Sequence, residues 1–176
     1  YRRQCMNGGG SVRFALSVLY VAFIGILFFF IGEALPRWAF HEDQFPFCSF
    51  RFEKGGKIYD KIYIRKWKSR LPDMSKIMKD MLPKTVNSRA GANDLQKLIK
   101  ETCVAEFVHF CLCIFSVGVY FFWKNSIGIF LTALSVLGNI PFILIQRFNR
   151  PHLVCIRDKM IAREERKKHA NTDIVG

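Results

Sequence analysis

The chain has 176 residues, of which 51% are hydrophobic, and it carries a formal net charge of +13. Its apolar residues are concentrated in blocks, and the basic residues lie between the blocks. This distribution is typical of a small integral membrane protein with basic loops that face an anionic leaflet. It argues against a soluble domain. It also argues against nucleic-acid binding, because the basic stretches directly adjoin apolar spans.

The six cysteines occur without a C-x-x-C pair. Three of them, Cys103, Cys111 and Cys113, fall within or at the edge of an apolar span. We interpret them as small, polarizable apolar residues. The sequence predicts no disulfide framework.

The first apolar block predicts a transmembrane helix over residues 12–35. About 20 apolar residues suffice to cross the hydrocarbon core. The block is longer than the apolar region of a signal peptide, and no small-x-small cleavage site follows it. Residues 1–11 are polar and glycine-rich, and we expect them to form a flexible lead. Trp38 suits the membrane interface after this span.

Residues 36–101 form a polar, basic segment that we expect at the membrane surface. Within 57–67, isoleucines and tyrosines recur four residues apart, which favours an amphipathic helix in the interface. A strand is the alternative, because both residue types are β-prone. A second helical stripe runs from Met74 to Leu82 and is stopped by Pro83.

Asn93, with Gln96 three residues later, resembles a capping box and predicts a helix start. This helix should run without a break into a second span over 102–123. A short polar turn then leads to a third span over 127–145, so that the two spans form a hairpin. Pro141 removes a backbone donor and should kink the third span.

Three crossings place segment 36–101 and the tail 154–176 on one side of the membrane. That side holds all but four of the 27 lysines and arginines. The positive-inside rule assigns this side to the cytoplasm. The predicted fold is therefore an all-α integral membrane protein. Its membrane domain, 12–153, combines three transmembrane helices with amphipathic interfacial helices on the cytoplasmic side, and the basic tail lies on the membrane surface.

Glu106 and His109 lie three residues apart in the second span, so their side chains share one helix face. Ionisable groups inside a hydrophobic span are costly and suggest a function by default. The pair is open to three interpretations: a polar contact between helices, a general base tuned by its neighbour, or part of a metal site. One E-x-x-H is half of a di-iron signature, and no second copy exists, so we predict no metal.

Two further groups of polar residues flank the spans. Asn139 lies inside the third span, and Arg147 and Arg150 lie at its cytoplasmic end. The arginines could clamp a phosphate or carboxylate, or they could serve only as positive-inside anchors. Anchoring does not account for Asn139. The run Arg65-Lys66-Trp67-Lys68 could bind a polyphosphate, or it could lie on lipid phosphates with its tryptophan at the boundary.

The motif IRKWKSRLPD at 64–73 resembles a signature of the glycosyl-4,4'-diaponeurosporenoate acyltransferase family, the CrtO-type membrane proteins. The stretches ETCVAEFVH at 101–109 and NIPFILIQRFNRP at 139–151 agree with it in order and type. The resemblance extends from about Phe14 to Leu153. It implies a small membrane enzyme that moves a fatty acyl group onto a sugar hydroxyl of a glycosylated carotenoid acid.

In an acyl transfer of this kind, the candidate catalytic residues are Glu106, His109 and Asn139. His109, held by Glu106, would take the proton of the attacking hydroxyl, and Asn139 or a nearby basic group would stabilise the oxyanion. Candidate substrate-binding residues carry cationic, amide or aromatic side chains: Arg65, Lys66, Trp67, Lys68, Arg147, Asn149 and Arg150. The expected partners are a membrane lipid or glycolipid acceptor and acyl-CoA or another activated donor, with no further cofactor. The sequence leaves a homodimer possible, because three spans enclose little space for a lipid.

Two other functions remain open from the residues alone. One is a different small membrane lipid transferase, such as a methyltransferase, for which Arg163-Glu164-Glu165 in the tail is the feature of interest. The other is a non-catalytic, lipid-binding membrane partner. In that case Glu106 and His109 would affect stability or association and no chemistry.

Overall fold

The structure is a computed structural model that describes residues 2–68 and 91–175. Within these two ranges the chain is helical and contains no strand, so the predicted all-α class is confirmed. Three helical stretches are long and apolar enough to cross a membrane: Gly9–Ala34, Ala92–Trp123 and Ser126–Lys167. They contain the second and third predicted spans in full and the first except for its last residue, Leu35. The predicted stripe Met74–Leu82 lies outside the described residues.

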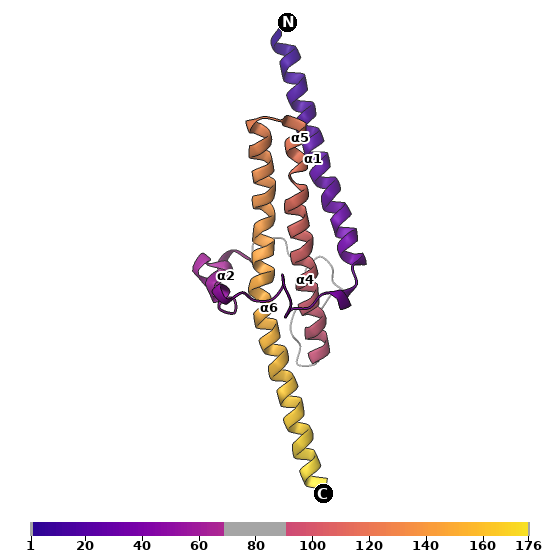
Figure 1. Ribbon diagram of the computed structural model, residues 1–176, viewed down its shortest axis with the longest axis vertical. Helices are drawn as coiled ribbons and strands as arrows, with labels where there is room; N and C mark the ends of the chain where they lie inside the picture. Colours follow the sequence, from indigo (N-terminus) through magenta and orange to yellow (C-terminus); the bar gives the residue numbers. More distant parts are fainter. Residues whose placement is uncertain (1, 69–90, 176) are drawn as a thin grey trace. The chain divides into compact units, whose positions relative to one another are not determined.

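The described residues form two compact units. The first contains residues 2–36 and 104–143, and the second contains 37–68, 91–103 and 144–175. Helix α1 (Arg2–Ala34) and helix α5 (Gly118–Trp123) both belong to the first unit, where they pack side by side (Figure 1).

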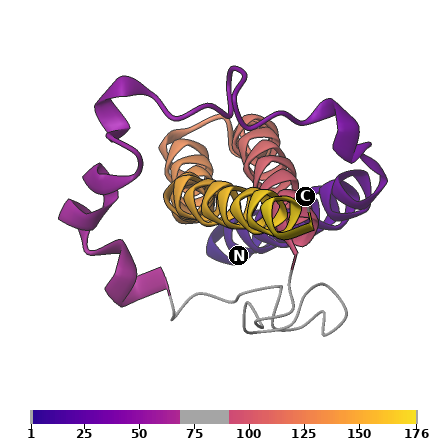
Figure 2. The same ribbon diagram turned by 90° about the horizontal axis from the view of Figure 1, so that it is seen from below.

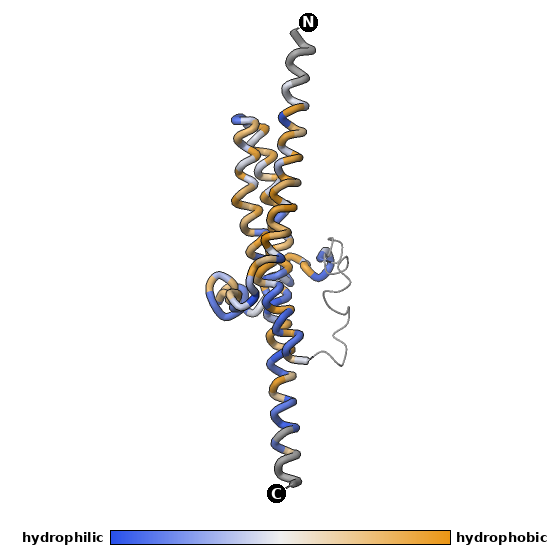
Figure 3. The backbone as a smooth tube through the Cα atoms, turned by 90° about the vertical axis from the view of Figure 1, so that its right-hand side faces the viewer, coloured by the Kyte–Doolittle hydropathy of each residue, from blue (hydrophilic) through white to orange (hydrophobic). Residues whose placement is uncertain are grey.

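Two helices contribute residues to both units: α4 (Ala92–Phe115) and α6 (Ser126–Val175). The hydropathy of α6 changes along its length. Its residues in the first unit are largely apolar, whereas those from Leu144 onward are mostly hydrophilic (Figure 3). The second unit therefore contains most of the hydrophilic residues of this helix.

Helix α1 begins at Arg2, so the segment predicted to be a flexible lead is helical. The lead contains no proline. Its glycines disfavour a helix by only about 1 kcal/mol each relative to alanine. The apolar span that follows can propagate the helix through them, because extending a formed helix is much easier than starting one.

The second predicted span is interrupted, which corrects the expectation of one helix that ends at Trp123. Helix α4 ends at Phe115, and α5 begins at Gly118. The N–H of Val119 would bond the Phe115 carbonyl in a continuous helix. It donates instead to the Ser116 carbonyl, 3.0 Å away.

A side chain from α1 makes this break tolerable. The Tyr20 hydroxyl donates to the released Phe115 carbonyl at 2.8 Å. A Cβ atom on Gly118 would lie only 2.2 Å from the Tyr20 Oη, so the contact requires glycine at this position. An unsatisfied carbonyl in a bilayer costs several kcal/mol, and Tyr20 removes that cost.

The hairpin between α5 and α6 is made by Lys124 and Asn125. Lys124 has a positive φ of 50°, and the Asn125 Oδ1 accepts the N–H of Gly128 at 3.1 Å, which caps α6. At the same end of the unit, the Trp123 Nε1 donates to the Ser17 Oγ at 2.9 Å.

Helix α6 continues through Pro141 and Pro151 to Val175, where the sequence predicted a span followed by a separate tail. A proline within a helix removes one backbone hydrogen bond. Neighbouring groups in membrane proteins commonly make up for that loss. The tail residues therefore extend the helix of the third span.

The predicted amphipathic helix over 57–67 is instead two short helices, η3 (Lys57–Ile62) and α2 (Ile64–Trp67). They are separated by Tyr63, whose φ of 53° cannot continue a right-handed helix. Two shorter 3-10 helices, η1 (Arg37–Ala39) and η2 (Arg51–Glu53), precede them. Figure 2 shows these elements following one another along a curved path.

The core of the second unit contains Tyr59, Ile64 and Phe148, all of which are buried. Leu144 and Trp67 pack against this cluster. The buried positions differ from the four-residue stripe that the sequence suggested, because the break at Tyr63 rotates α2 relative to η3.

A buried ion pair ties α6 to the segment 46–59. The Arg147 Nε lies 2.5 Å from the Glu53 Oε1, and the two side chains are 10% and 2% exposed. A second guanidinium nitrogen donates to the Glu53 Oε2 at 3.1 Å. Glu53 also accepts the Tyr59 hydroxyl and the N–H of Phe50. Arg147 donates further to the carbonyls of Pro46 and Cys48.

These hydrogen bonds set the charge states of the cluster. Burial alone would raise the pKa of Glu53, but the bonds from Arg147, Tyr59 and the Phe50 backbone outweigh it and hold the pKa below its ordinary value. Burial, followed by the hydrogen bond to Glu53, raises the pKa of Tyr59 to about 12. The carboxylate therefore stays charged, and the phenol stays neutral.

We expect Tyr20→Phe to destabilise the first unit by about 1–3 kcal/mol, because it leaves the Phe115 carbonyl without its side-chain donor. The free energy of unfolding in detergent micelles measures this effect. Tyr120→Phe is the matched control, since that hydroxyl has no hydrogen bond among the residues that the structure describes. Equal losses in the two variants would contradict the role given to Tyr20.

Removing the Glu53 charge should destabilise the second unit strongly. The folded-state pKa of Glu53 lies below the unfolded value, so its contribution is complete at neutral pH. It is lost as the pH falls from the unfolded pKa through the folded one. Glu53→Gln should cost about 3–5 kcal/mol at pH 7, because Arg147 stays buried without its counter-ion.

Thermal unfolding of the purified protein at pH 7 and pH 4 tests this expectation. Glu53→Gln should flatten the pH dependence of the wild-type chain between these values. Asp60→Asn is the control, since it breaks the exposed pair with Arg65 and should cost less than about 1 kcal/mol. A loss of stability in Asp60→Asn as large as that in Glu53→Gln would show that the buried pair stabilises the unit no more than the exposed pair does.

Candidate functional site

In the first unit, His109 on α4 contacts two residues of α6. Its Nδ1 lies 2.9 Å from the Oδ1 of Asn139. Its ring stacks on Phe142 with a centroid separation of 4.7 Å and an interplanar angle of 9°. The amide Nδ2 of Asn139 donates to the Ser135 carbonyl at 3.0 Å. The stack on Phe142 thus holds the face of the imidazole, and the contact with Asn139 holds its Nδ1 edge.

The hydrogen-bond pattern defines which ring nitrogen of His109 carries the proton. Because the Asn139 nitrogen donates to Ser135, its oxygen is the group that faces His109. An oxygen acceptor requires that Nδ1 be the donor, so the neutral ring keeps its lone pair on Nε2. That tautomer can accept a proton at Nε2 without losing its contact with Asn139.

Glu106 is buried, at 7% exposure, one helical turn before His109. The sequence suggested that it holds His109, and it assigned Asn139 to an oxyanion. The structure pairs His109 with Asn139 directly. A signal for this pairing exists in the sequence, because the two residues are equidistant from Lys124 at the hairpin turn. Antiparallel helices bring equidistant residues to the same level.

In the second unit, the basic run predicted to bind substrate lies on and after α2. Arg65 forms an exposed pair with Asp60 at 2.9 Å. The ammonium of Lys66 lies 4.8 Å from the centre of the Tyr63 ring. The Trp67 Nε1 donates to the Ile62 carbonyl at 2.9 Å. The tryptophan and Arg65 therefore have local partners that fix the short helix.

Lys68 connects this run to α6. Its Nζ lies 3.1 Å from the Asn149 Oδ1 and 4.6 Å from the centre of the Phe148 ring. Arg65 approaches the same ring at 5.7 Å. Burial, and then the charge of Arg65, lowers the pKa of Lys68. Two cations thus share one aromatic ring, and an anion bound between them would relieve their repulsion.

Arg147 and Arg150, also predicted to bind substrate, are engaged with protein groups. Arg147 forms the buried pair with Glu53. Arg150 is 3% exposed and donates to the Thr102 Oγ1 at 2.9 Å, the Thr102 carbonyl at 3.1 Å and the Phe47 carbonyl at 2.6 Å. Both arginines join separate segments of the second unit, and a substrate role for them stays a prediction.

The second unit also contains a cavity of about 940 Å³ that the sequence did not indicate. Residues from the segment 41–53, from the start of α4 and from α6 line it, including His41, Lys100 and Lys159. No local motif joins these residues, since they come from three distant stretches of the chain. Only the fold brings them together.

Comparison with known proteins assigns the family. The model of the CrtO family, glycosyl-4,4'-diaponeurosporenoate acyltransferase, matches residues 36–159. The chain is 32% identical over 142 residues to the glycosyl-4,4'-diaponeurosporenoate acyltransferase of Staphylococcus aureus strain N315. It is 29% identical over 137 residues to that of strain MRSA252. Each match covers 77% of this chain and 82% of the relative. No solved structure matches the chain.

The matched region contains the described residues of both candidate sites, from Arg65 to Arg150. The alternatives of a methyltransferase and of a non-catalytic partner have no support from the comparisons, whereas the resemblance found in the motifs is confirmed. The three apolar helices indicate a multi-pass membrane protein. The chain belongs to the CrtO family of glycosyl-4,4'-diaponeurosporenoate acyltransferases, and it is an acyltransferase.

Proposed function

We propose that this acyltransferase moves a fatty acyl group from an activated donor onto a sugar hydroxyl of a glycosylated, lipid-linked acceptor. The names of the S. aureus relatives specify glycosyl-4,4'-diaponeurosporenoate as their acceptor. A glycosylated carotenoid acid of this class is therefore the acceptor that we propose here. Its long apolar chain suits a protein with three candidate spans.

The orientation of His109 by Asn139 and Phe142 carries the catalytic part of the proposal. The acceptor hydroxyl attacks the acyl carbonyl as the Nε2 of His109 takes its proton. The new C–O bond forms and the bond from the acyl carbon to the donor's leaving group breaks. For a thioester donor, the imidazolium then returns the proton to the thiolate. General base catalysis of this kind typically contributes about 10²–10⁴-fold.

Asn139 and Glu106 support this step in different ways. Asn139 acts as a positioning residue, because its oxygen fixes the tautomer of His109 and its nitrogen bonds the Ser135 carbonyl. Glu106 lies three residues before His109, a spacing that places the two side chains about 5–6 Å apart at Cβ.

The second unit would supply contacts to phosphate groups. Arg65, Lys66, Lys68 and Asn149, which we term the basic cluster, combine cations with an amide at the surface of the unit. Phosphates of a donor or of lipid headgroups present the same chemistry to such a cluster. The electrostatic repulsion between Arg65 and Lys68, which both lie near the Phe148 ring, supports an anionic occupant.

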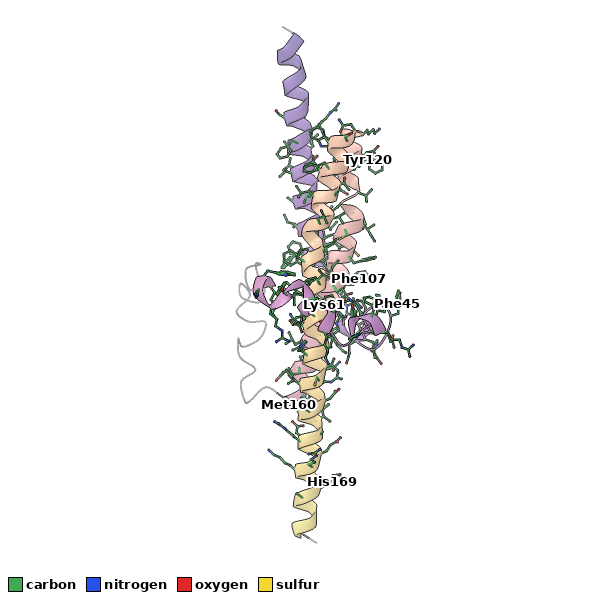
Figure 4. The ribbon with its side chains drawn as sticks, turned by 90° about the vertical axis from the view of Figure 1, so that its left-hand side faces the viewer. Phe45, Lys61, Phe107, Tyr120, Met160 and His169 are labelled. Atoms are coloured by element: carbon green, nitrogen blue, oxygen red, sulfur yellow. The ribbon has the colours of Figure 1, made fainter. Side chains whose placement is uncertain are left out.

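The catalytic proposal predicts the effect of His109→Ala. Acyl transfer should fall by about 10²–10⁴-fold, because the attacking hydroxyl loses its base. The assay is formation of the acylated glycolipid by purified protein, followed by mass spectrometry. The matched control is His169→Ala, which removes an exposed histidine near the end of α6 (Figure 4).

Asn139→Ala and Asn139→Asp refine this test. Aspartate keeps an oxygen acceptor for the Nδ1 proton, so it should retain more activity than alanine. Both variants must insert into the membrane like the wild-type chain. Undiminished transfer by correctly inserted His109→Ala protein would remove His109 from the mechanism.

We also propose that the basic segment 36–101 and the tail face the cytoplasm, because nearly all basic residues lie there. Cys155 is a free, exposed thiol on the basic side, and Lys124 is exposed in the opposite hairpin turn. We predict that a membrane-impermeant maleimide labels Lys124→Cys in intact cells and labels Cys155 only after lysis. Each thiol is tested in a background without the other cysteines. The reverse labelling pattern would contradict the orientation.

A further inference from the structure

The cavity in the second unit has the size of a small-molecule site. Its volume of about 940 Å³ is near the upper end of the range of roughly 300–1,000 Å³ that such pockets occupy. Its lining mixes charged side chains with apolar ones such as Phe47, Val154 and Ala162. A pocket of this volume exceeds what a single phosphate or simple anion fills.

Two ion pairs make part of its wall rigid. Glu53 is held by Arg147, as described above. Glu42 is held by Arg157, which also bonds the Gln96 amide oxygen and pairs with Asp158 at 2.9 Å. Burial would raise the pKa of Glu42, but its hydrogen bonds, including those from Arg157 and Gln96, keep the pKa below its ordinary value. Arg147 balances Glu53, whereas Arg157 shares its single charge between Glu42 and Asp158. The linked side chains leave this part of the wall preorganised.

Two other cations in the lining are not compensated. Lys100 is half-buried on α4, and Lys159 is exposed on α6. Neither makes a hydrogen bond or ion pair with any residue that the structure describes. Asp43 is the acidic side chain at the same cavity that lacks such a partner, and it is exposed. A half-buried ammonium in a preorganised pocket favours an anionic ligand.

The aromatic side chain of Phe47 belongs to the same lining, and its ring centroid lies 5.5 Å from that of Phe40. The Phe47 ring has the Arg150 guanidinium 5.6 Å from its centre. A flat ring of a ligand can stack on such a side chain, and its phosphates can reach lysines nearby. The combination fits a nucleotide better than a sugar or a lone phosphate.

We propose that this cavity binds the phosphate-bearing nucleotide end of the activated acyl donor, a group of the coenzyme A class. The inference rests on the proposed acyl transfer and adds where the donor is recognised. Lys100 and Lys159 contact the phosphates, and Phe47 contacts the base. The basic cluster of Arg65, Lys66, Lys68 and Asn149 is then left for lipid headgroup phosphates.

The test is calorimetric titration of coenzyme A into the purified full-length protein in nanodiscs. The wild-type chain should bind, and added salt should weaken binding. Lys100→Met should raise the Kd by about tenfold or more, because a charge-assisted contact is lost. Lys159→Met, at an exposed position, should also raise the Kd and is less prone to disturb folding. Lys100→Arg should restore most of the affinity.

Two matched variants serve as controls. Lys97→Met removes the same charge from the exposed side of the same helix, outside the cavity lining. Lys68→Met removes a cation of the basic cluster. Lys97→Met should leave the Kd for coenzyme A within about twofold. Lys68→Met tests whether the donor phosphates lie on the basic cluster instead of in the cavity. A loss confined to Lys68→Met, an equal loss in Lys97→Met, or no binding by the wild-type chain would each overturn the proposal.

Failure of this inference and failure of the proposed function give different results. A wild-type chain that acylates its acceptor but binds no coenzyme A, for instance because a protein-linked acyl group is its donor, refutes only the cavity assignment. A His109→Ala chain that keeps full transfer activity, while Lys100→Met weakens coenzyme A binding, refutes only the catalytic role of His109.

Discussion

The buried ion pair between Arg147 and Glu53 is the contact around which the second unit is organised. Glu53 is 2% exposed and receives donors from Arg147, Tyr59 and Phe50. Such a pair stabilises only when its remaining hydrogen-bonding groups are satisfied, and here they are. It fixes the segment 46–59 against α6 and forms one wall of the cavity. Arg150 acts in a similar way, because its hydrogen bonds join Thr102 and Phe47 to the same helix.

In the first unit, one polar contact orients the side chain that we propose as the catalytic base. The amide nitrogen of Asn139 donates to the Ser135 carbonyl, and this bond orients the amide oxygen toward His109. Stacking on Phe142 prevents the ring from turning. A histidine held in one tautomer between two membrane helices suits the proton transfer that we propose.

Sequence patterns predicted the three spans and the hairpin, because apolar block length and helical spacing are local properties. They also singled out Glu106, His109 and Asn139 as candidate site residues, a role that stays a prediction. They missed the break after Phe115, since the hydroxyl that bonds the released carbonyl, that of Tyr20, lies on another helix. They also missed the break at Tyr63, because a positive φ at a tyrosine has no sequence signal and the four-residue spacing continues through it. The partners of Arg147 and the cavity could not be found either, because they join segments far apart in the chain.

The central claim is that His109 acts as the base in acyl transfer to a sugar hydroxyl. The most direct measurement is the mass and linkage of the product formed by purified His109→Gln protein from a glycosylated carotenoid acid and an activated fatty acid. Glutamine keeps an N–H for Asn139 but has no titratable nitrogen. The account predicts a sugar ester from the wild-type chain and almost none from the variant. Equal amounts of ester from both proteins would contradict it.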